Sequence, residues 1–276
     1  MKSLRKAAWL AIALALVSCT GCRDVVLRVT ARKFLTTGPN GPETPKDLVI
    51  PYDHVTIPSQ DNRQLDGFLV TAPQTCATRP ALLIFHGVGE TISLWVKAQK
   101  YLYDHCVSSL VFDYSGHGNS SRPGTIENVD EDSVAAYQYF LSKFPDGRRC
   151  IFGFSLGNGP LLDSIHSFRP IPSCVVLASP FTSIRDASRH RGTPEWETYL
   201  VPDVWNNLKN VAKVHAPLLV IHSDVDNVNP LQGAKQVFEA AYEPKQWVLV
   251  RDVQHNAPFK DPSDAFWGPV LKFIEQ

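Results

Sequence analysis

The sequence predicts an α/β domain, a doubly wound and mostly parallel sheet of about eight strands with helices on both faces. Short apolar runs alternate with longer amphipathic stretches along most of the chain. The apolar runs are near-continuous in Val, Ile, Leu and Phe, as expected for strands that helices cover on both sides. The chain has 276 residues, 44% hydrophobic and 20% charged, which is enough apolar material for one full-size core.

The N-terminus is expected to be a targeting segment outside this fold. Residues 1–6 carry three basic side chains, and residues 7–17 form an apolar run of signal-peptide length, too short to span a bilayer. Residues 16–19, Leu-Val-Ser-Cys, resemble a bacterial lipobox. We therefore expect residues 1–18 to be a signal peptide and Cys19 to be the lipidated first residue of the mature protein.

This expectation places the protein outside the cytoplasm as a lipoprotein. Thr20, rather than an aspartate, follows Cys19, and by resemblance to Gram-negative sorting signals this favours the outer membrane. The membrane is then a partner through the N-terminal lipid. An ordinary cleaved signal and an uncleaved anchor are the alternatives. Nothing in the sequence indicates a subunit interface, so we expect a monomer.

Charge and composition exclude other partners. The formal net charge is zero, and no Lys/Arg run with interleaved aromatics is present, so nucleic acid is not expected as a partner. Cys19 and Cys22 have the C-x-x-C spacing of a redox or metal site, but their place beside the expected cleavage site does not favour such a role. No other cluster suggests a metal site, and no cofactor is expected.

The rest of the chain divides into a tether and a domain. Residues 19–46 are expected to form the tether, because residues 36–46 hold three prolines and two glycines, a loop composition. Residues 47–276 are expected to form the domain. It opens with two strands within 54–73, joined by the polar turn 59–62. Further strands are expected at 81–87, 108–116, 149–155, 174–180, 216–223 and 246–252, and helices at 93–105, 129–144, 158–168, 230–242 and 263–275.

Four cysteines lie in the expected domain. Cys106, Cys150 and Cys174 stand just before or at the start of expected strands, and Cys76 lies shortly before one. Starts of parallel strands meet at one edge of a sheet, and export implies an oxidising compartment. The pairs Cys76–Cys106 and Cys150–Cys174 are therefore one hypothesis, and free buried thiols are the other.

Chemically suggestive residues gather at the opposite ends of the expected strands. His86-Gly87, Asp113 and Ser155 stand at or near the ends of expected strands. The acidic loop with Asp224 and Asp226 follows the next-to-last strand, and His255 follows the last. Ligands of such sheets lie at the carboxyl ends of the strands. Ser155 stands within Gly-Phe-Ser-Leu-Gly, and serine, acid and histidine follow in the chain order expected when that string is a nucleophile elbow.

From about residue 50 on, the chain resembles the serine α/β-hydrolases. The resemblance rests on "HG" after a strand, "FDYSGHGNS", "GFSLG", "SPFTSIRD" and "QHN". "SPFTSIRD" is most similar to monoacylglycerol and lysophospholipid lipases and protein depalmitoylases. The chain departs from the family in having His222-Ser223 where His-Gly is common, and Gln254 where glycine is common before the histidine.

The resemblance implies a catalytic triad. Ser155 would be the nucleophile, His255 the base that takes its proton, and Asp226 the acid that fixes the imidazole, with Asp224 as the alternative acid. The backbone amides of Val88 and Leu156 would form the oxyanion hole. Gly153 and Gly157 are expected because side chains there would collide with a neighbouring strand or helix.

Other polar residues near the triad receive lesser roles. His86 is expected to make structural hydrogen bonds under the oxyanion loop, and Asp113 to pin the turn after its strand. His117 is expected to be solvated or to line the pocket.

The expected function is hydrolysis of a carboxylic ester, with acylglycerols, lysophospholipids and thioesters as candidate substrates. The interval from Phe181 to His215 is too short for a large cap, although Trp196, Tyr199 and Trp205 suit a small aromatic flap. A peptidase or amidase on the same fold is the second hypothesis. A non-catalytic envelope lipoprotein that uses the fold for binding is the third.

Overall fold

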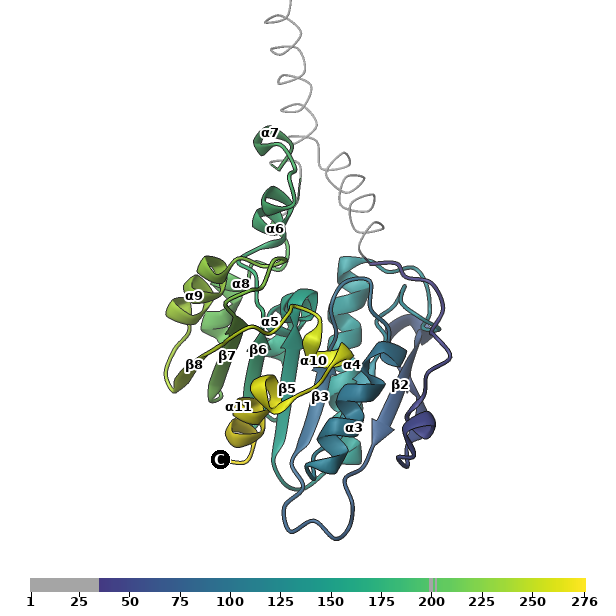
Figure 1. Cartoon of the computed structure of the whole chain (residues 1–276). Coiled ribbons are helices and arrows are strands. Elements are labelled where there is room, and N and C mark those ends of the chain that lie inside the picture. The colour runs from purple at the N-terminus through teal and green to yellow at the C-terminus, as the bar shows by residue number, and fades with distance from the viewer. Residues whose placement is uncertain (1–34, 199–200, 202) are drawn as a thin grey trace, which may run out of the picture.

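A computed structural model describes residues 35–198, 201 and 203–276, and these build an α/β fold around one sheet (Figure 1). The described strands are β1 (Asp53–Pro58), β2 (Gln64–Val70), β3 (Ala81–Phe85), β4 (Ser108–Phe112), β5 (Arg149–Phe154), β6 (Cys174–Ala178), β7 (Leu218–Ser223) and β8 (Lys245–Val250). They form an eight-stranded sheet in the order β1-β2-β4-β3-β5-β6-β7-β8. Strand β2 is antiparallel to β1 and β4, and the remaining pairs are parallel. The predicted fold class is confirmed.

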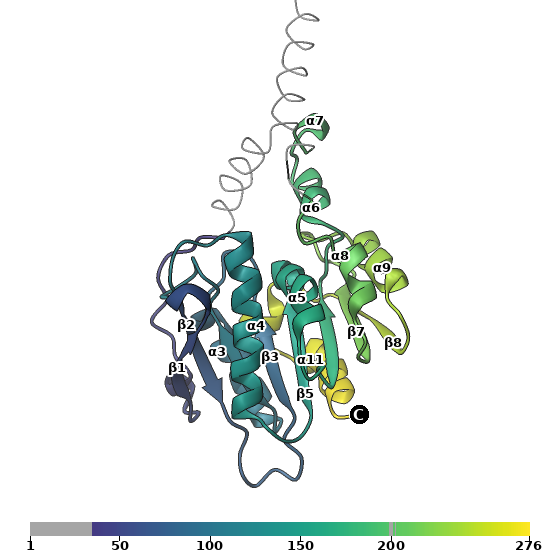
Figure 2. The ribbon, with the colours of Figure 1, turned by 180° about the vertical axis from the view of Figure 1, so that it is seen from behind.

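Helices cover both faces of the sheet (Figures 1 and 2). They are α3 (Val96–Asp104), α4 (Ile126–Lys143), α5 (Asn158–Ser164), α6 (Ile184–His190), α7 (Glu195–Thr198), α8 (Asn207–Asn210), α9 (Leu231–Ala240), α10 (Ala257–Lys260) and α11 (Asp264–Ile274). Apolar residues of α4, α5 and α9 pack with one set of alternating strand residues, and those of α3 and α11 with the other. This two-sided burial explains why the strands are apolar throughout.

The register of the parallel strands brings the candidate residues to one edge. Phe85 of β3 pairs with Gly153 of β5, and Phe154 of β5 pairs with Ala178 of β6. The loops that follow these strands therefore start side by side. Strands β7 and β8 also end in register, at Ser223 and Val250, so the acidic loop and the loop with His255 leave the sheet at the same edge.

The described part of the expected tether packs on the domain. Leu35 is fully buried in the core, and the Thr37 amide donates a hydrogen bond to the Gly116 carbonyl at 3.1 Å. The guanidinium of Arg122 donates a hydrogen bond to the Thr37 carbonyl at 3.0 Å. The prolines and glycines of residues 35–46 thus shape a strap that the apolar Leu35 holds down, so this part is not a free linker. The expected signal peptide, Cys19 and residues 19–34 lie outside the described residues.

The segment between β6 and β7 is short, as expected. Helices α6 and α7 extend beyond the carboxyl end of the sheet (Figures 1 and 2). Trp205 is buried against α5, where a Cβ on Gly159 would lie 2.9 Å from its side chain. It is thus a packing residue. Tyr199 and the side chain of Trp196 lie outside the described part of the chain.

Two disulfides join Cys76 to Cys106 and Cys150 to Cys174. Cys150 and Cys174 are opposite each other in the β5–β6 register, at the strand ends far from Ser155. No helix among the described residues has the length and apolar character needed to cross a bilayer.

Candidate active site

Ser155 stands directly after β5 in an unusual backbone conformation. Phe154 is extended, and Ser155 then takes a φ of +50° at the start of a 3₁₀ turn over Ser155–Gly157 that leads into α5. A positive φ is costly for a residue with a Cβ, and such strain at a strand-to-helix turn is the feature of a nucleophile elbow. The side chain is nearly buried, with 2% of the residue exposed.

The two glycines around Ser155 are required by space. A Cβ on Gly157 would overlap the carbonyl of Phe85 on the neighbouring strand. A Cβ on Gly153 would lie 2.8 Å from the side-chain oxygen of Asn158 on the following helix. These contacts confirm the expectation that side chains at both positions would collide with a strand or a helix.

Asp226 and His255 form a buried hydrogen-bonded pair. His255 Nδ1 lies 2.8 Å from Asp226 Oδ2, and the other carboxylate oxygen accepts two backbone amides, those of Val228 and Asn229, at 2.9 Å. Burial alone would raise the pKa of Asp226. The hydrogen bond and charge of His255, with the two amides, outweigh burial and lower that pKa to about 2. The carboxylate therefore stays ionised and directs the Nδ1–H of the ring toward itself. This leaves Nε2 as the ring nitrogen that can accept a proton.

Asp224, the alternative acid, lies elsewhere. It is exposed, and its carboxylate accepts the Asp252 amide at 2.9 Å. Of the two acids in the loop, the structure brings only Asp226 to His255.

His255 contacts Phe154, the residue that precedes Ser155. The ring of His255 lies against that of Phe154, with centroids 5.0 Å apart. Between the described side chains of Ser155 and His255 there is no hydrogen bond. Ser155 Oγ accepts instead from Asn229 Nδ2 at 3.4 Å. Hydrogen bonds between a catalytic serine and its base are often long or poorly aligned before substrate binds. The missing bond is therefore compatible with His255 as the base.

A glutamate fixes the loop after β3. Glu90 Oε2 accepts the Gly87 amide at 2.8 Å and the indole N–H of Trp95 at 2.9 Å. The Val88 amide, between these anchors, has no acceptor among the described residues. The Leu156 amide lies in the first turn after Ser155, where backbone N–H groups lack intrahelical partners. Both expected oxyanion donors thus stand in loops that adjoin Ser155.

Below this loop lies a buried polar cluster. His86 Nε2 is 3.3 Å from Asp113 Oδ1, and the same carboxylate oxygen accepts the Ile92 amide at 3.0 Å. Asp113 therefore fixes the loop after β3, and not the turn after its own strand as expected. His86 is structural, as expected, because its Nδ1 lies 3.0 Å from the Gly87 carbonyl of the same loop.

The expectation for His117 is wrong. The residue is fully buried, neither solvated nor lining a pocket, and its ring packs near those of His86 and Tyr114. Burial, with the charge of nearby His86, lowers the pKa of His117 to about 3 and keeps it neutral. The glycines on both sides let this turn fold inward, which the polar composition of the segment concealed.

Three residues near the site were missed in the sequence: Glu90, Asn158 and Asn229. Each stands beside a motif that was recognised. Asn158 follows the Gly-Phe-Ser-Leu-Gly string and Asn229 follows the acid by three residues. Their positions at the start of a helix and before a proline are also typical of ordinary capping residues, so position alone did not reveal their contacts.

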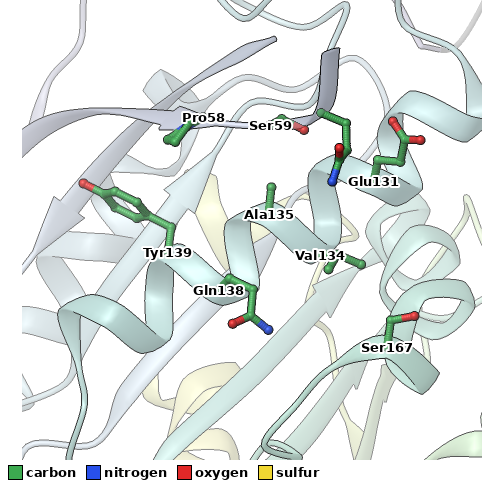
Figure 3. Close-up of a pocket in the computed structure, with 9 residues that line it drawn as sticks. Pro58, Ser59, Glu131, Val134, Ala135, Gln138, Tyr139 and Ser167 are labelled. Carbon is green, nitrogen blue, oxygen red and sulfur yellow. The ribbon is translucent and has the colours of Figure 1, made fainter. Parts of the chain in front are cut away.

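Other candidate sites are weaker. In the described ranges, no three His, Cys, Asp or Glu side chains are grouped so that they could hold a metal ion. A groove of about 560 Å³ lies between the β1–β2 turn and α4, lined by Pro58, Ser59, Gln60, Glu131, Val134, Ala135, Gln138, Tyr139 and Ser167 (Figure 3). None of its lining residues belongs to the loops around Ser155, so it is separate from the candidate active site.

Comparison with known proteins agrees with this geometry. Residues 80–193 match the family model described as alpha/beta hydrolase fold. An uncharacterized protein of Mycobacterium tuberculosis is 31% identical over 223 residues, which cover 79% of this chain and 78% of that protein. The lysophosphatidylserine lipase ABHD12 of Danio rerio is 25% identical over 190 residues, 61% of this chain and 49% of that protein.

A solved structure shares the fold. The Pyrococcus furiosus esterase Pf2001 superimposes with a TM-score of 0.65 at 20% identity, over 87% of this chain and 96% of that one. With the match to the family model and the 31% identical relative, we conclude that the chain belongs to the α/β-hydrolase family.

Proposed function

We propose that this protein is a serine hydrolase that cleaves carboxylic esters through a covalent acyl-enzyme. The observation that carries the proposal is the strained backbone of Ser155, with φ +50°, at the same sheet edge as the hydrogen-bonded pair Asp226–His255. A strained backbone conformation persists only where the surrounding structure enforces it, and such residues cluster at active sites. The membership of the chain in the hydrolase family supports it.

The reaction follows from the roles of the three side chains. His255 Nε2 takes the hydroxyl proton as Ser155 Oγ bonds to the ester carbonyl carbon, and Asp226 stabilises the imidazolium. The proton then passes to the alcohol oxygen as the ester bond breaks. Water attacks the acyl-enzyme with the same base, and the acid product leaves as Oγ regains its proton.

Two amides are suited to the charge that develops on the carbonyl oxygen. The Val88 amide is held in a loop that Glu90 anchors, and the Leu156 amide follows the nucleophile. Fixed donors of this type lose nothing to reorganisation during the reaction, and each contributes on the order of 3 kcal/mol to the transition state.

We propose single-chain lipid esters as the substrate class, with lysophospholipids first, then acylglycerols and thioesters. The relative from Danio rerio named as a lysophosphatidylserine lipase supports this choice. The short segment between β6 and β7 supports it too, because it leaves little chain to enclose a substrate. A lipid anchor at Cys19 would place the enzyme at its substrate's membrane and remains a prediction from the sequence.

The first test is covalent labelling. A fluorophosphonate probe should label the purified protein, and Ser155→Ala should abolish both labelling and hydrolysis of p-nitrophenyl esters. Ser167→Ala, an exposed serine in the separate groove, serves as the control and should keep both. Persistent labelling of Ser155→Ala would refute the assignment. A panel of lysophospholipids, monoacylglycerols, thioesters and aminoacyl amides would then rank the substrates.

A further inference from the structure

Two buried asparagines hold the turn that carries Ser155. Asn158 Nδ2 donates to the Ser155 carbonyl and to the Ala178 carbonyl, both at 2.9 Å. Asn229 Nδ2 donates to the Ser179 carbonyl at 2.8 Å and to Ser155 Oγ at 3.4 Å. Both amides thus tie the turn to the end of β6, but only Asn229 reaches the side-chain oxygen.

The direction of the Asn229 amide follows from its partner. A backbone carbonyl only accepts hydrogen bonds, so the nitrogen end must face the Ser179 carbonyl. That nitrogen has two hydrogens, and the second is the one available to Ser155 Oγ. Because Asn229 can only donate there, the hydroxyl hydrogen of Ser155 must point to another acceptor. In the proposed reaction that acceptor is His255 Nε2.

Burial and strain indicate that this contact is built into the site. Asn229 is 3% exposed, so its amide has little water to compete for its hydrogens. Its partner Ser179 has a φ of +48° and Ser155 a φ of +50°, both unusual for residues with a Cβ. One side chain therefore bridges two strained residues, and its place in the loop is itself fixed, since its backbone amide donates to Asp226 at 2.9 Å.

We propose that Asn229 is a catalytic residue that donates a hydrogen bond to Ser155 Oγ. The proposal rests on the proposed serine mechanism and extends it. The bond selects the hydroxyl orientation in which the proton faces His255. It also stabilises the negative charge on Oγ as this oxygen attacks the ester, and again as it leaves in the hydrolysis of the acyl-enzyme, because hydrogen bonds to charged acceptors are the stronger ones.

The test uses Asn229→Ala and Asn229→Asp in the full chain, with p-nitrophenyl butyrate and a fluorophosphonate. We expect kcat/KM for Asn229→Ala to fall about tenfold, the equivalent of one hydrogen bond, with KM within about twofold of wild type. The rate of fluorophosphonate inactivation should fall to a similar degree. Asn229→Asp keeps the shape and removes the donor when ionised, so at pH 8 it should lose at least as much.

Asn207→Ala is the matched control. Asn207 is fully buried and donates to the Phe181 carbonyl at 2.9 Å, yet it does not contact Ser155. It should lower the melting temperature and leave kcat/KM unchanged. A folded Asn229→Ala or Asn229→Asp with wild-type kcat and inactivation rate, or with a change in KM alone, would overturn the role of Asn229. Failure of the wild-type protein to label at Ser155 would instead reject the serine mechanism, and this inference with it.

Discussion

The conformation of Ser155 depends on neutral groups, and its proposed reactivity depends on Asp226 and His255. The asparagine amides and the two glycines fix the turn, whereas Asp226 and His255 would provide the proton transfer in the proposed reaction. The pair is buried, with 7% of the His255 side chain and none of the Asp226 side chain exposed, so little water competes for its hydrogen bond. At this scale the site combines a constraint on one backbone torsion with one buried hydrogen-bonded pair.

Asp226→Asn tests the charged part. The amide keeps the size of the side chain but removes the charge that orients and stabilises the imidazolium. We expect kcat for ester hydrolysis to fall about 10³–10⁴-fold, as for the loss of the acid in comparable triads. Asp224→Asn, the exposed neighbour in the same loop, should keep wild-type kcat. Equal losses in the two variants would contradict the choice of Asp226.

Asp226 also makes the free energy of unfolding depend on pH. The pKa of Asp226 is about 2 in the folded chain, against an ordinary value of 3.8 that applies to the unfolded chain. A lowered folded pKa contributes stability that is present above the unfolded value and lost as the pH falls through the folded one. In urea unfolding, wild type should therefore be more stable than Asp226→Asn by about 2 kcal/mol at neutral pH. This difference in the free energy of unfolding should shrink between pH 4 and pH 2.

The sequence predicted the candidate triad but not the groups that hold it in place. Ser155, Asp226 and His255 stand out because chemistry restricts their types and the order of strands restricts their places. Asn229 acts across two loops, after β5 and after β7, and no local pattern records such a contact. Nor could the sequence predict that His117 folds inward, because its glycine-rich turn is equally typical of an exposed loop.

At the scale of elements, α4 and α5 hold the segment before β7 through two acids. The Trp205 indole donates to Asp130 of α4 at 2.8 Å, and the Asn210 amide donates to Asp163 of α5 at 2.6 Å. Burial, with the neighbouring charge of Asp163, raises the pKa of Asp130 to about 8, although the hydrogen bond from Trp205 opposes the rise. Asp130 thus keeps its proton at neutral pH.

Asp130→Asn tests this pair. The folded pKa lies above the unfolded value of 3.8, so the protonated acid contributes stability that is complete below pH 3.8 and lost as the pH rises through about 8. An amide stays neutral and avoids that loss. We expect the stability of the variant relative to wild type to grow with pH, by at most ~1.4 kcal/mol per pH unit. Urea unfolding at pH 5, 7 and 9 measures it, with the exposed Asp146→Asn as a control that should show no such trend.

Across the whole molecule, covalent links and chemistry occupy opposite edges of the sheet. The disulfides join residues at the starts of the parallel strands, and the candidate triad follows the ends of β5, β7 and β8. The sequence predicted this division because strand polarity alone decides it. It left the pairing of the cysteines open, since free buried thiols fit the same positions.

Reduction of the disulfides should therefore affect stability and spare activity. Cys76–Cys106 links positions 30 residues apart and both residues are partly exposed, whereas Cys150 and Cys174 are fully buried. A mild reductant should open Cys76–Cys106 first. We expect a loss of about 3 kcal/mol in the free energy of unfolding, with kcat/KM at 25 °C unchanged. The double variant Cys76→Ser/Cys106→Ser should reproduce both results, and a fall in its kcat/KM at 25 °C would contradict the separation.

The hydrogen bonds of Asn229 to the Ser179 carbonyl and Ser155 Oγ affect how a nucleophile turn can be transferred to another protein. A designer who grafts Gly-Phe-Ser-Leu-Gly onto another parallel sheet would copy the turn without the amides that keep it bent. The host would also need an asparagine to follow its acid and a carbonyl at the end of the adjoining strand to receive it. A graft would thus have to include the loops that follow three strands, equivalent to β5, β6 and β7. A graft of the five residues alone should relax into an ordinary turn.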